Sequence, residues 1–220
     1  MVKFKATSTE TCSQTNDFPP TMPSGLENLS NSEHFSLNVE AQIVKKMVFH
    51  LRLNKDIGLP SEYTELLNVL RRAKPEDEVH IYINSPGGYL CSTVEIVNAM
   101  SMCEGTIITH ACGTIASAAT MIFLAGHVQI IMEDVEFMCH YYSTGFWGKG
   151  QELETYAKHS QKSNQKFMWR FYKGFLTKKE FKALCNGKDY WFGAKELAKR
   201  VKRRIKTLGL DQPQEENIAQ

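Results

Sequence analysis

Ser117 stands where a strand-like run ends and a stretch of small residues begins, a position from which a protein can present a nucleophile. Residues 106–112 are rich in β-branched side chains and predict a strand, whereas 116–125 predicts a buried helix that ends at Gly126. Ser117 therefore lies near a helix N-terminus. A serine there can attack a carbonyl group if it has partners, or it can simply cap the helix. The residue alone does not decide between these roles.

A nucleophilic serine needs a base that takes its proton and an acid that orients the base. His140 is the candidate base, because it follows the strand-like residues 136–139 and precedes a glycine-rich loop, where α/β proteins place functional groups. Asp189 is the candidate acid, because its aromatic neighbours 190–192 are expected to bury it partly. The alternatives are a structural histidine and a turn aspartate.

The same chemistry needs backbone amides that hold the developing oxyanion. Gly87 and Gly88 follow a predicted strand and precede a predicted helix, so their amides can approach a ligand closely and point toward an anion. A tight turn is the alternative interpretation of this Pro-Gly-Gly sequence.

The elements around these residues alternate between strands and helices. Hydrophobic periodicity predicts strands over 43–51, 79–83, 106–112, 128–132 and 136–142, and helices over 61–73, 89–102 and 116–125. Such alternation with short connections predicts an α/β fold whose parallel strands are joined by right-handed helical crossovers.

Two further helices are predicted toward the C-terminus. The segment 151–175 carries an aromatic stripe and would extend about 37 Å as a helix, so we expect part of it to project toward another subunit. The helix 193–205 ends in five cations that we interpret as a solvated face: Lys199, Arg200, Lys202, Arg203 and Arg204.

Length and hydrophobic content predict one well-filled α/β domain. Its 220 residues carry a net charge of +2, which argues against nucleic-acid binding, and its six cysteines have no metal-ligand spacing and predict no metal or cofactor. We found no leader peptide and no apolar run of transmembrane length, so we expect no membrane contact and a reducing cytoplasm. The predicted organisation is a flexible polar tail (1–33), one catalytic domain (34–205) and a polar C-terminal tail (206–220).

Four blocks of sequence together resemble the proteolytic subunit of the Clp protease. They are Ile81–Gly88, Gly113–Ala119 with Ala125–Gly126, Met138–His140 and Lys188–Glu196, in that family's order and approximate spacing. The resemblance implies an α/β fold of the crotonase-like kind, built from repeated ββα units with a projecting handle helix. The stretch Val201–Arg204 departs from the family's usual Gly-Leu-(Val/Ile)-Asp segment, so we expect different packing there.

The resemblance also implies a serine endopeptidase. Ser117 would be the nucleophile, His140 the general base and Asp189 the residue that orients it, with the amides of Gly88 and Ala118 as the oxyanion hole. An extended polypeptide substrate would pair with backbone on two sides of the site, and the substrate-binding residues would be Gly87, Gly88, Tyr142, Ser143, Thr144 and Gly145.

The implied partners are copies of the same chain and a Clp-type AAA+ unfoldase. Heptameric rings stacked as a tetradecamer would enclose the active sites, and organelle stroma or a phage-infected cell are further possible locations. Two other functions stay open: a crotonase-type acyl-CoA enzyme, which would not need Ser117, and a non-catalytic subunit of a mixed Clp complex.

Overall fold

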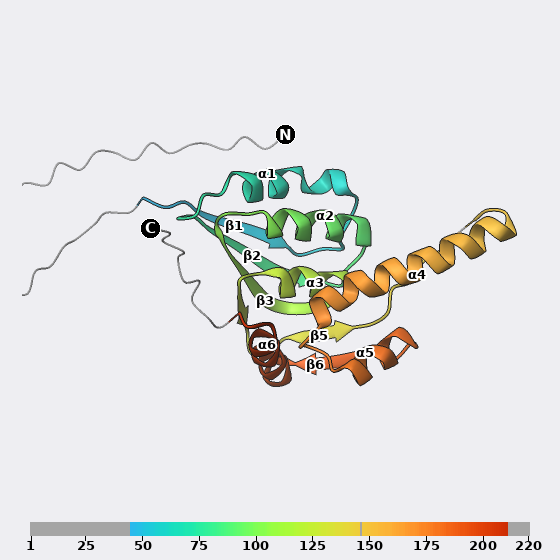
Figure 1. Ribbon diagram of the computed structural model, residues 1–220. Helices are drawn as coiled ribbons and strands as arrows, with labels where there is room; N and C mark the ends of the chain where they lie inside the picture. The colour runs from blue at the N-terminus through green and yellow to red at the C-terminus, as the bar shows by residue number, and fades with distance from the viewer. Residues whose placement is uncertain (1–44, 146, 211–220) are drawn as a thin grey trace, which may run out of the picture. The chain divides into compact units, whose positions relative to one another are not determined.

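A six-stranded sheet, mostly parallel, carries the site (Figure 1). The order is β1-β2-β3-β5-β6, with β4 also paired to β3, and only the β5–β6 pair is antiparallel. The strands are β1 (Val48–Leu53), β2 (Glu78–Ser85), β3 (Thr106–Ala116), β4 (Val128–Ile131), β5 (Glu136–Cys139) and β6 (Tyr190–Gly193). The predicted α/β class with parallel strands is confirmed, and the architecture agrees with the crotonase-like fold.

The computed structural model describes residues 45–145 and 147–210. The predicted tail 1–33 and most of the predicted tail 206–220 lie outside the described residues, so the domain boundaries stay a prediction. In the described ranges, no helix is long and apolar enough to cross a membrane.

Helices pack on the sheet and bury the apolar residues of its central strands. α1 (Thr64–Arg72), α2 (Leu90–Ser101) and α3 (Ala118–Ala125) follow one another across the sheet, and a short 3-10 turn, η1 (Pro60–Tyr63), precedes α1. The core combines alternate residues of β2 with the inner side of α2, all between 0% and 1% exposed: Val79, Ile81, Ile83, Ile96, Val97 and Met100. This burial fixes the ends of β2 and β3, from which the candidate site residues extend.

β3 is longer than the sequence predicted. The predicted strand ended at Cys112, but the small residues that follow continue to pair: Ile115 with Ser85 of β2 and Thr114–Ala116 with β5. Because the strand runs to Ala116, the turn into α3 is left to a single residue, Ser117.

The long helix predicted over 151–175 is α4 (Gly150–Tyr172), whose 23 residues extend about 34 Å. Figure 1 shows it running outward from the sheet. Its buried residues are confined to the C-terminal end, Met168, Phe171 and Tyr172, while Tyr156 in its first half is 52% exposed. The first half of α4 is thus largely exposed.

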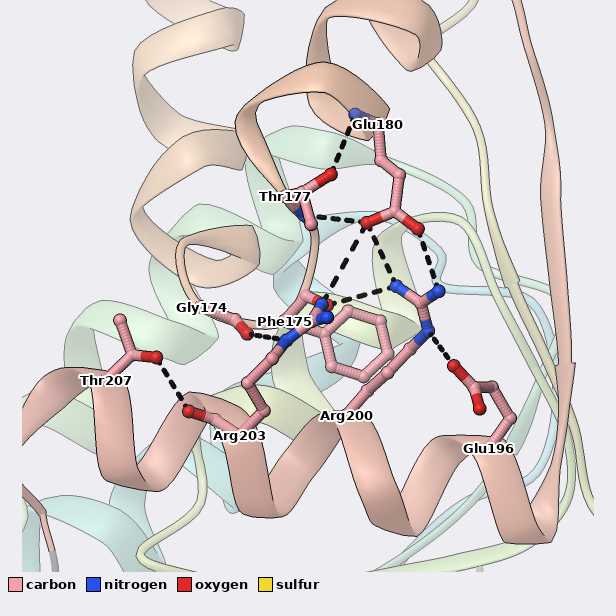
Figure 2. A network of polar contacts seen from close by, with 8 residues as sticks. All are labelled: Gly174, Phe175, Thr177, Glu180, Glu196, Arg200, Arg203 and Thr207. Atoms are coloured by element: carbon pink, nitrogen blue, oxygen red, sulfur yellow. Dashed lines mark hydrogen bonds and ion pairs between the residues drawn. The ribbon is translucent and has the colours of Figure 1, made fainter.

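Arginines of α6 (Ala194–Leu208) hold the end of α4 and the start of α5 (Lys178–Cys185), as Figure 2 shows. Arg200 binds both carboxylate oxygens of Glu180, at 2.8 and 3.2 Å. Arg203 donates its Nε to the carbonyl of Gly174 at 2.9 Å and its Nη2 to the carbonyl of Phe175. The network fixes the turn between α4 and α5.

This network corrects the prediction of a solvated basic face. Lys199 and Lys202 are exposed as predicted, but Arg204 is 8% exposed and donates its Nε to the carbonyl of Phe171, and the Arg200 side chain is 12% exposed. Carbonyl groups at the end of a helix lack intrahelical donors, and these guanidinium groups supply them. The stretch Val201–Arg204 lies within α6 and binds the C-terminal end of α4 through Arg204, while its difference from the family's packing stays a prediction.

The Glu180–Arg200 ion pair predicts an acid-sensitive fold. Arg200 lowers the pKa of Glu180 from 4.5 to about 2. Because the folded pKa is the lower one, the stabilisation is present above pH 4.5 and is lost as the pH falls toward 2.

We expect E180Q to lower the free energy of unfolding at pH 7 by about 2 kcal/mol in urea denaturation. The exposed pair Lys158–Glu154 is the control, and E154Q should cost under about 0.5 kcal/mol. Equal effects of the two variants would contradict the prediction.

Candidate active site

Ser117 occupies the turn between β3 and α3 in a strained conformation. Its φ is 55° and its ψ is −127°, and it is the only non-glycine residue with positive φ in the described part of the chain. Such strain costs on the order of 1–3 kcal/mol and concentrates at functional sites. Ser117 precedes the first residue of α3, but its side chain makes no capping hydrogen bond. The capping alternative is therefore wrong, and the hydroxyl has another partner.

That partner is His140. The Nε2 of His140 lies 2.7 Å from the Oγ of Ser117, within hydrogen-bond distance. The backbone explains the contact: the amide of Ser117 donates to the carbonyl of Met138 at 2.9 Å, and His140 follows directly after the end of β5. Serine and histidine are thus 23 positions apart in sequence but are brought together by the pairing of β3 with β5.

Asp189 lies close to His140 along the sheet but does not hold it. The antiparallel register pairs Cys139 with Tyr190, so the next position along each strand places Asp189 opposite His140. Asp189 is exposed, and among the described residues no hydrogen bond joins its carboxylate to His140. The expectation that aromatic neighbours partly bury Asp189 is wrong: Phe192 is buried in the core, but Asp189 stays exposed and Trp191, two positions further on, is 59% exposed.

The paired glycines bring a second turn against Ser117. A Cβ on Gly87, whose φ is +99°, would lie 2.6 Å from the Cβ of Ser117 and 2.7 Å from the carbonyl oxygen of Ala116. A Cβ on Gly88 would lie 2.2 Å from the carbonyl oxygen of Ile57. Only glycine fits these two positions. The absence of a side chain at Gly87 allows the turn between β2 and α2 to pack directly against Ser117.

Two backbone amides remain unpaired beside the Ser117 hydroxyl. The carbonyl of Gly87 and the amide of Tyr89 both bond to Ile57, so the amide of Gly88 between them points the other way. The amide of Ala118 is the first of α3 and has no helical partner. Within the described ranges neither amide donates a hydrogen bond, so both can bind an anion.

A cavity of about 760 Å³ opens onto these groups. Ser117, Ala118, His140 and Gly88 contribute to its wall, as do Tyr142–Gly145, which the resemblance assigned to substrate binding. Gly87 lies behind Ser117 and is absent from the lining. Apolar side chains of the wall come from α2, α3 and α4: Leu90, Val94, Met121 and Met168.

Sequence reasoning missed Tyr172, which is among the residues that line this cavity, and Thr120, to which it is hydrogen-bonded. Both are fully buried and hydrogen-bonded to each other, and Thr120 also bonds the carbonyl of Ser117. The available signal was a single polar residue, Thr120, within the apolar run of α3. A buried hydroxyl needs a partner, so its presence there called for one.

Comparison with protein families agrees with the geometry. The family model of Clp protease matches residues 31–200. The chain therefore belongs to the Clp protease family. The matched region contains every residue of the site described above, from the Gly87–Gly88 turn to Asp189.

A curated relative in the Clp protease family is the "ATP-dependent Clp protease proteolytic subunit 3" of Rhizobium meliloti (strain 1021). It is 26% identical over 126 residues, which are 56% of this chain and 65% of the relative. The chain thus aligns with less than two thirds of that relative's length.

Proposed function

We propose that this protein is a serine endopeptidase that hydrolyses peptide bonds of unfolded polypeptides. The observation that carries the proposal is the 2.7 Å contact between Ser117 Oγ and His140 Nε2 at a strained turn. A nucleophile held against a base in a cavity is the arrangement that acyl transfer requires. Membership of the Clp protease family supports the same chemistry.

In the proposed mechanism the Ser117 hydroxyl donates its proton to His140 Nε2 as the oxygen attacks the scissile carbonyl. The amides of Gly88 and Ala118 would bind the oxyanion, and His140 would return the proton to the leaving amine. Water then attacks the acyl-enzyme by the same route, so serine and histidine return to their starting states. Backbone near Gly88 on one side and Tyr142–Gly145 on the other would pair with an extended substrate, which favours broad sequence specificity.

The test is hydrolysis of a small fluorogenic peptide by the full-length protein, with an acyl-CoA thioester as the competing substrate. The proposal predicts peptide cleavage and no thioester turnover that survives replacement of Ser117. Thioester hydrolysis that persists in S117A, with no peptide cleavage, would instead identify a crotonase-type acyl-CoA enzyme.

Asp189 is proposed to orient His140, and its exposure predicts a limited role. We expect D189N to lower kcat/KM about tenfold, because a solvent-exposed carboxylate without a formed hydrogen bond contributes less than a buried one. Steady-state kinetics on the same peptide measures this, with the exposed Asp134→Asn as the control. Unchanged activity would show that Asp189 takes no part in catalysis. A thousandfold loss would show that its carboxylate binds His140 in the active enzyme.

Assembly into rings is proposed from the long projecting helix. The first half of α4 is largely exposed, and Trp147 just before it is 100% exposed, so this part of the chain is available for contact with a second copy. The relative's name describes one proteolytic subunit of an ATP-dependent protease. Membership of the family supports the proposal of stacked heptamers fed by a Clp-type unfoldase, and a native mass of fourteen chains is the result expected for them. The cytoplasmic location stays a prediction.

A further inference from the structure

Two buried side chains, those of Thr120 and Tyr172, form a row of hydrogen bonds that ends at the backbone of Ser117. The hydroxyl of Thr120, one turn into α3, donates to the carbonyl of Ser117 at 2.5 Å. The phenol oxygen of Tyr172, the last residue of α4, lies 2.6 Å from the same hydroxyl. Both side chains are 0% exposed, and Tyr172 belongs to the hydrophobic core cluster. Polar groups in such surroundings cost free energy unless they are paired, so their pairing here is specific.

The direction of these hydrogen bonds is fixed by the number of protons available. Thr120 donates its one proton to the Ser117 carbonyl, so it must accept from the phenol of Tyr172. Burial raises the pKa of Tyr172 well above its ordinary value of 10, so the phenol keeps the proton that it donates. The hydrogen bonds therefore run from the Tyr172 phenol through the Thr120 hydroxyl to the Ser117 carbonyl.

The end of these hydrogen bonds is the backbone of the nucleophile, because the carbonyl belongs to the strained Ser117 itself. That carbonyl also accepts the amide of Thr120 at 3.1 Å, so two donors hold the strained peptide in place. Tyr172 comes from another element, and its phenol joins the C-terminal end of α4 to the first turn of α3.

We propose that Tyr172, acting through Thr120, is a positioning residue that fixes the carbonyl of Ser117 and with it the orientation of the nucleophile toward His140. The proposal rests on the proposed function. Neither side chain touches reacting atoms, so the chemistry stays with Ser117 and His140. Loss of the row would let the strained peptide relax, and misplacement by about 1 Å can slow an enzymatic reaction about a hundredfold.

The experiment removes each hydroxyl while keeping side-chain volume. We expect Y172F and T120V to lower kcat on the fluorogenic peptide about tenfold, with KM unchanged. We expect them to slow equally the phosphonylation of Ser117 by a fluorophosphonate, in which Oγ displaces fluoride. T120S keeps the hydroxyl and should stay within about twofold of the wild type. T109V is the matched control, because Thr109 is also buried and donates to an α3 carbonyl, that of Phe123, at 2.8 Å.

The outcomes separate this proposal from the proposed function. Wild-type rates in both Y172F and T120V, or an equal loss in T109V, would overturn the positioning role and leave the peptidase intact. A wild-type protein that neither cleaves peptides nor reacts at Ser117 would overturn the peptidase. Crystal structures of the wild type and Y172F test the positioning role separately from activity. A distance between Ser117 Oγ and His140 Nε2 that lengthens in Y172F beyond hydrogen-bond range supports the role, and an unchanged distance refutes it.

Discussion

Replacement of Ser117 by alanine should abolish peptide hydrolysis, lowering kcat/KM by at least about 10⁴-fold. The variant loses the only group that His140 Nε2 contacts in the described part of the chain, and alanine cannot form an acyl-enzyme. The fold should persist, because the side chain makes no capping hydrogen bond and its Cβ is retained. Steady-state kinetics on the fluorogenic peptide, together with thermal unfolding, checks both parts of the prediction.

S101A is the control for this variant. Ser101 is exposed at the end of α2 and bonds only a carbonyl of its own helix, so its loss should leave hydrolysis unchanged. If S117A retained the activity of the wild type while keeping its fold, the observed hydrolysis would come from another subunit. The chain would then be the non-catalytic member of a mixed complex.

Alanine at Gly87 should disable the site almost as severely. The added Cβ would lie 2.6 Å from the Cβ of Ser117 and 2.9 Å from the amide of Ala118, and φ there is +99°. Either the nucleophile or the proposed oxyanion hole must move, so we expect kcat/KM to fall about a hundredfold or more. Positive φ adds a stability cost of about 1–2 kcal/mol. Kinetics and urea denaturation of G87A measure the two effects separately.

Gly209 supplies the matched comparison, since its φ is +68° and nothing lies within 4 Å of an added Cβ. G209A should share the backbone penalty and keep its activity. If both variants lost activity alike, strain would explain the effect and the close approach of Gly87 to Ser117 would not. If G87A stayed fully active, the turn could not have the role proposed for it.

Local sequence patterns were sufficient to predict the strands β1 to β5 and the two turns that meet at Ser117, but not β6 or its antiparallel pairing with β5. The alternation of strands and helices predicted that the strands are parallel, because short crossovers permit few other arrangements. Gly87 and Gly88 were identifiable because paired glycines between a predicted strand and a predicted helix allow a close backbone approach. The end of β3 was misjudged, since small residues in isolation suggest a turn, and only pairing with β5 makes them a strand.

Long-range contacts could not be predicted. Arg200 and Arg204 belong to a run of cations that, in the sequence alone, is typical of a solvated face. In the fold they donate hydrogen bonds to backbone carbonyl groups at and just after the C-terminal end of α4, which lies far away in the sequence. The exposure of Asp189 likewise depends on its place at the end of β6, although its aromatic neighbours suggested burial. The bond from Thr120 to Tyr172 spans 52 positions, a separation that no local periodicity encodes.

The central claim is that Ser117 is an activated nucleophile, and covalent labelling tests it most directly. The wild-type protein is treated with a fluorophosphonate, weighed intact by mass spectrometry and digested for peptide mapping. We expect one adduct per chain, located on Ser117. We also expect the fluorophosphonate to label H140A much more slowly, because that variant lacks the base. A protein that cleaves peptides while Ser117 stays unlabelled, or that carries its adduct on another residue, would contradict it.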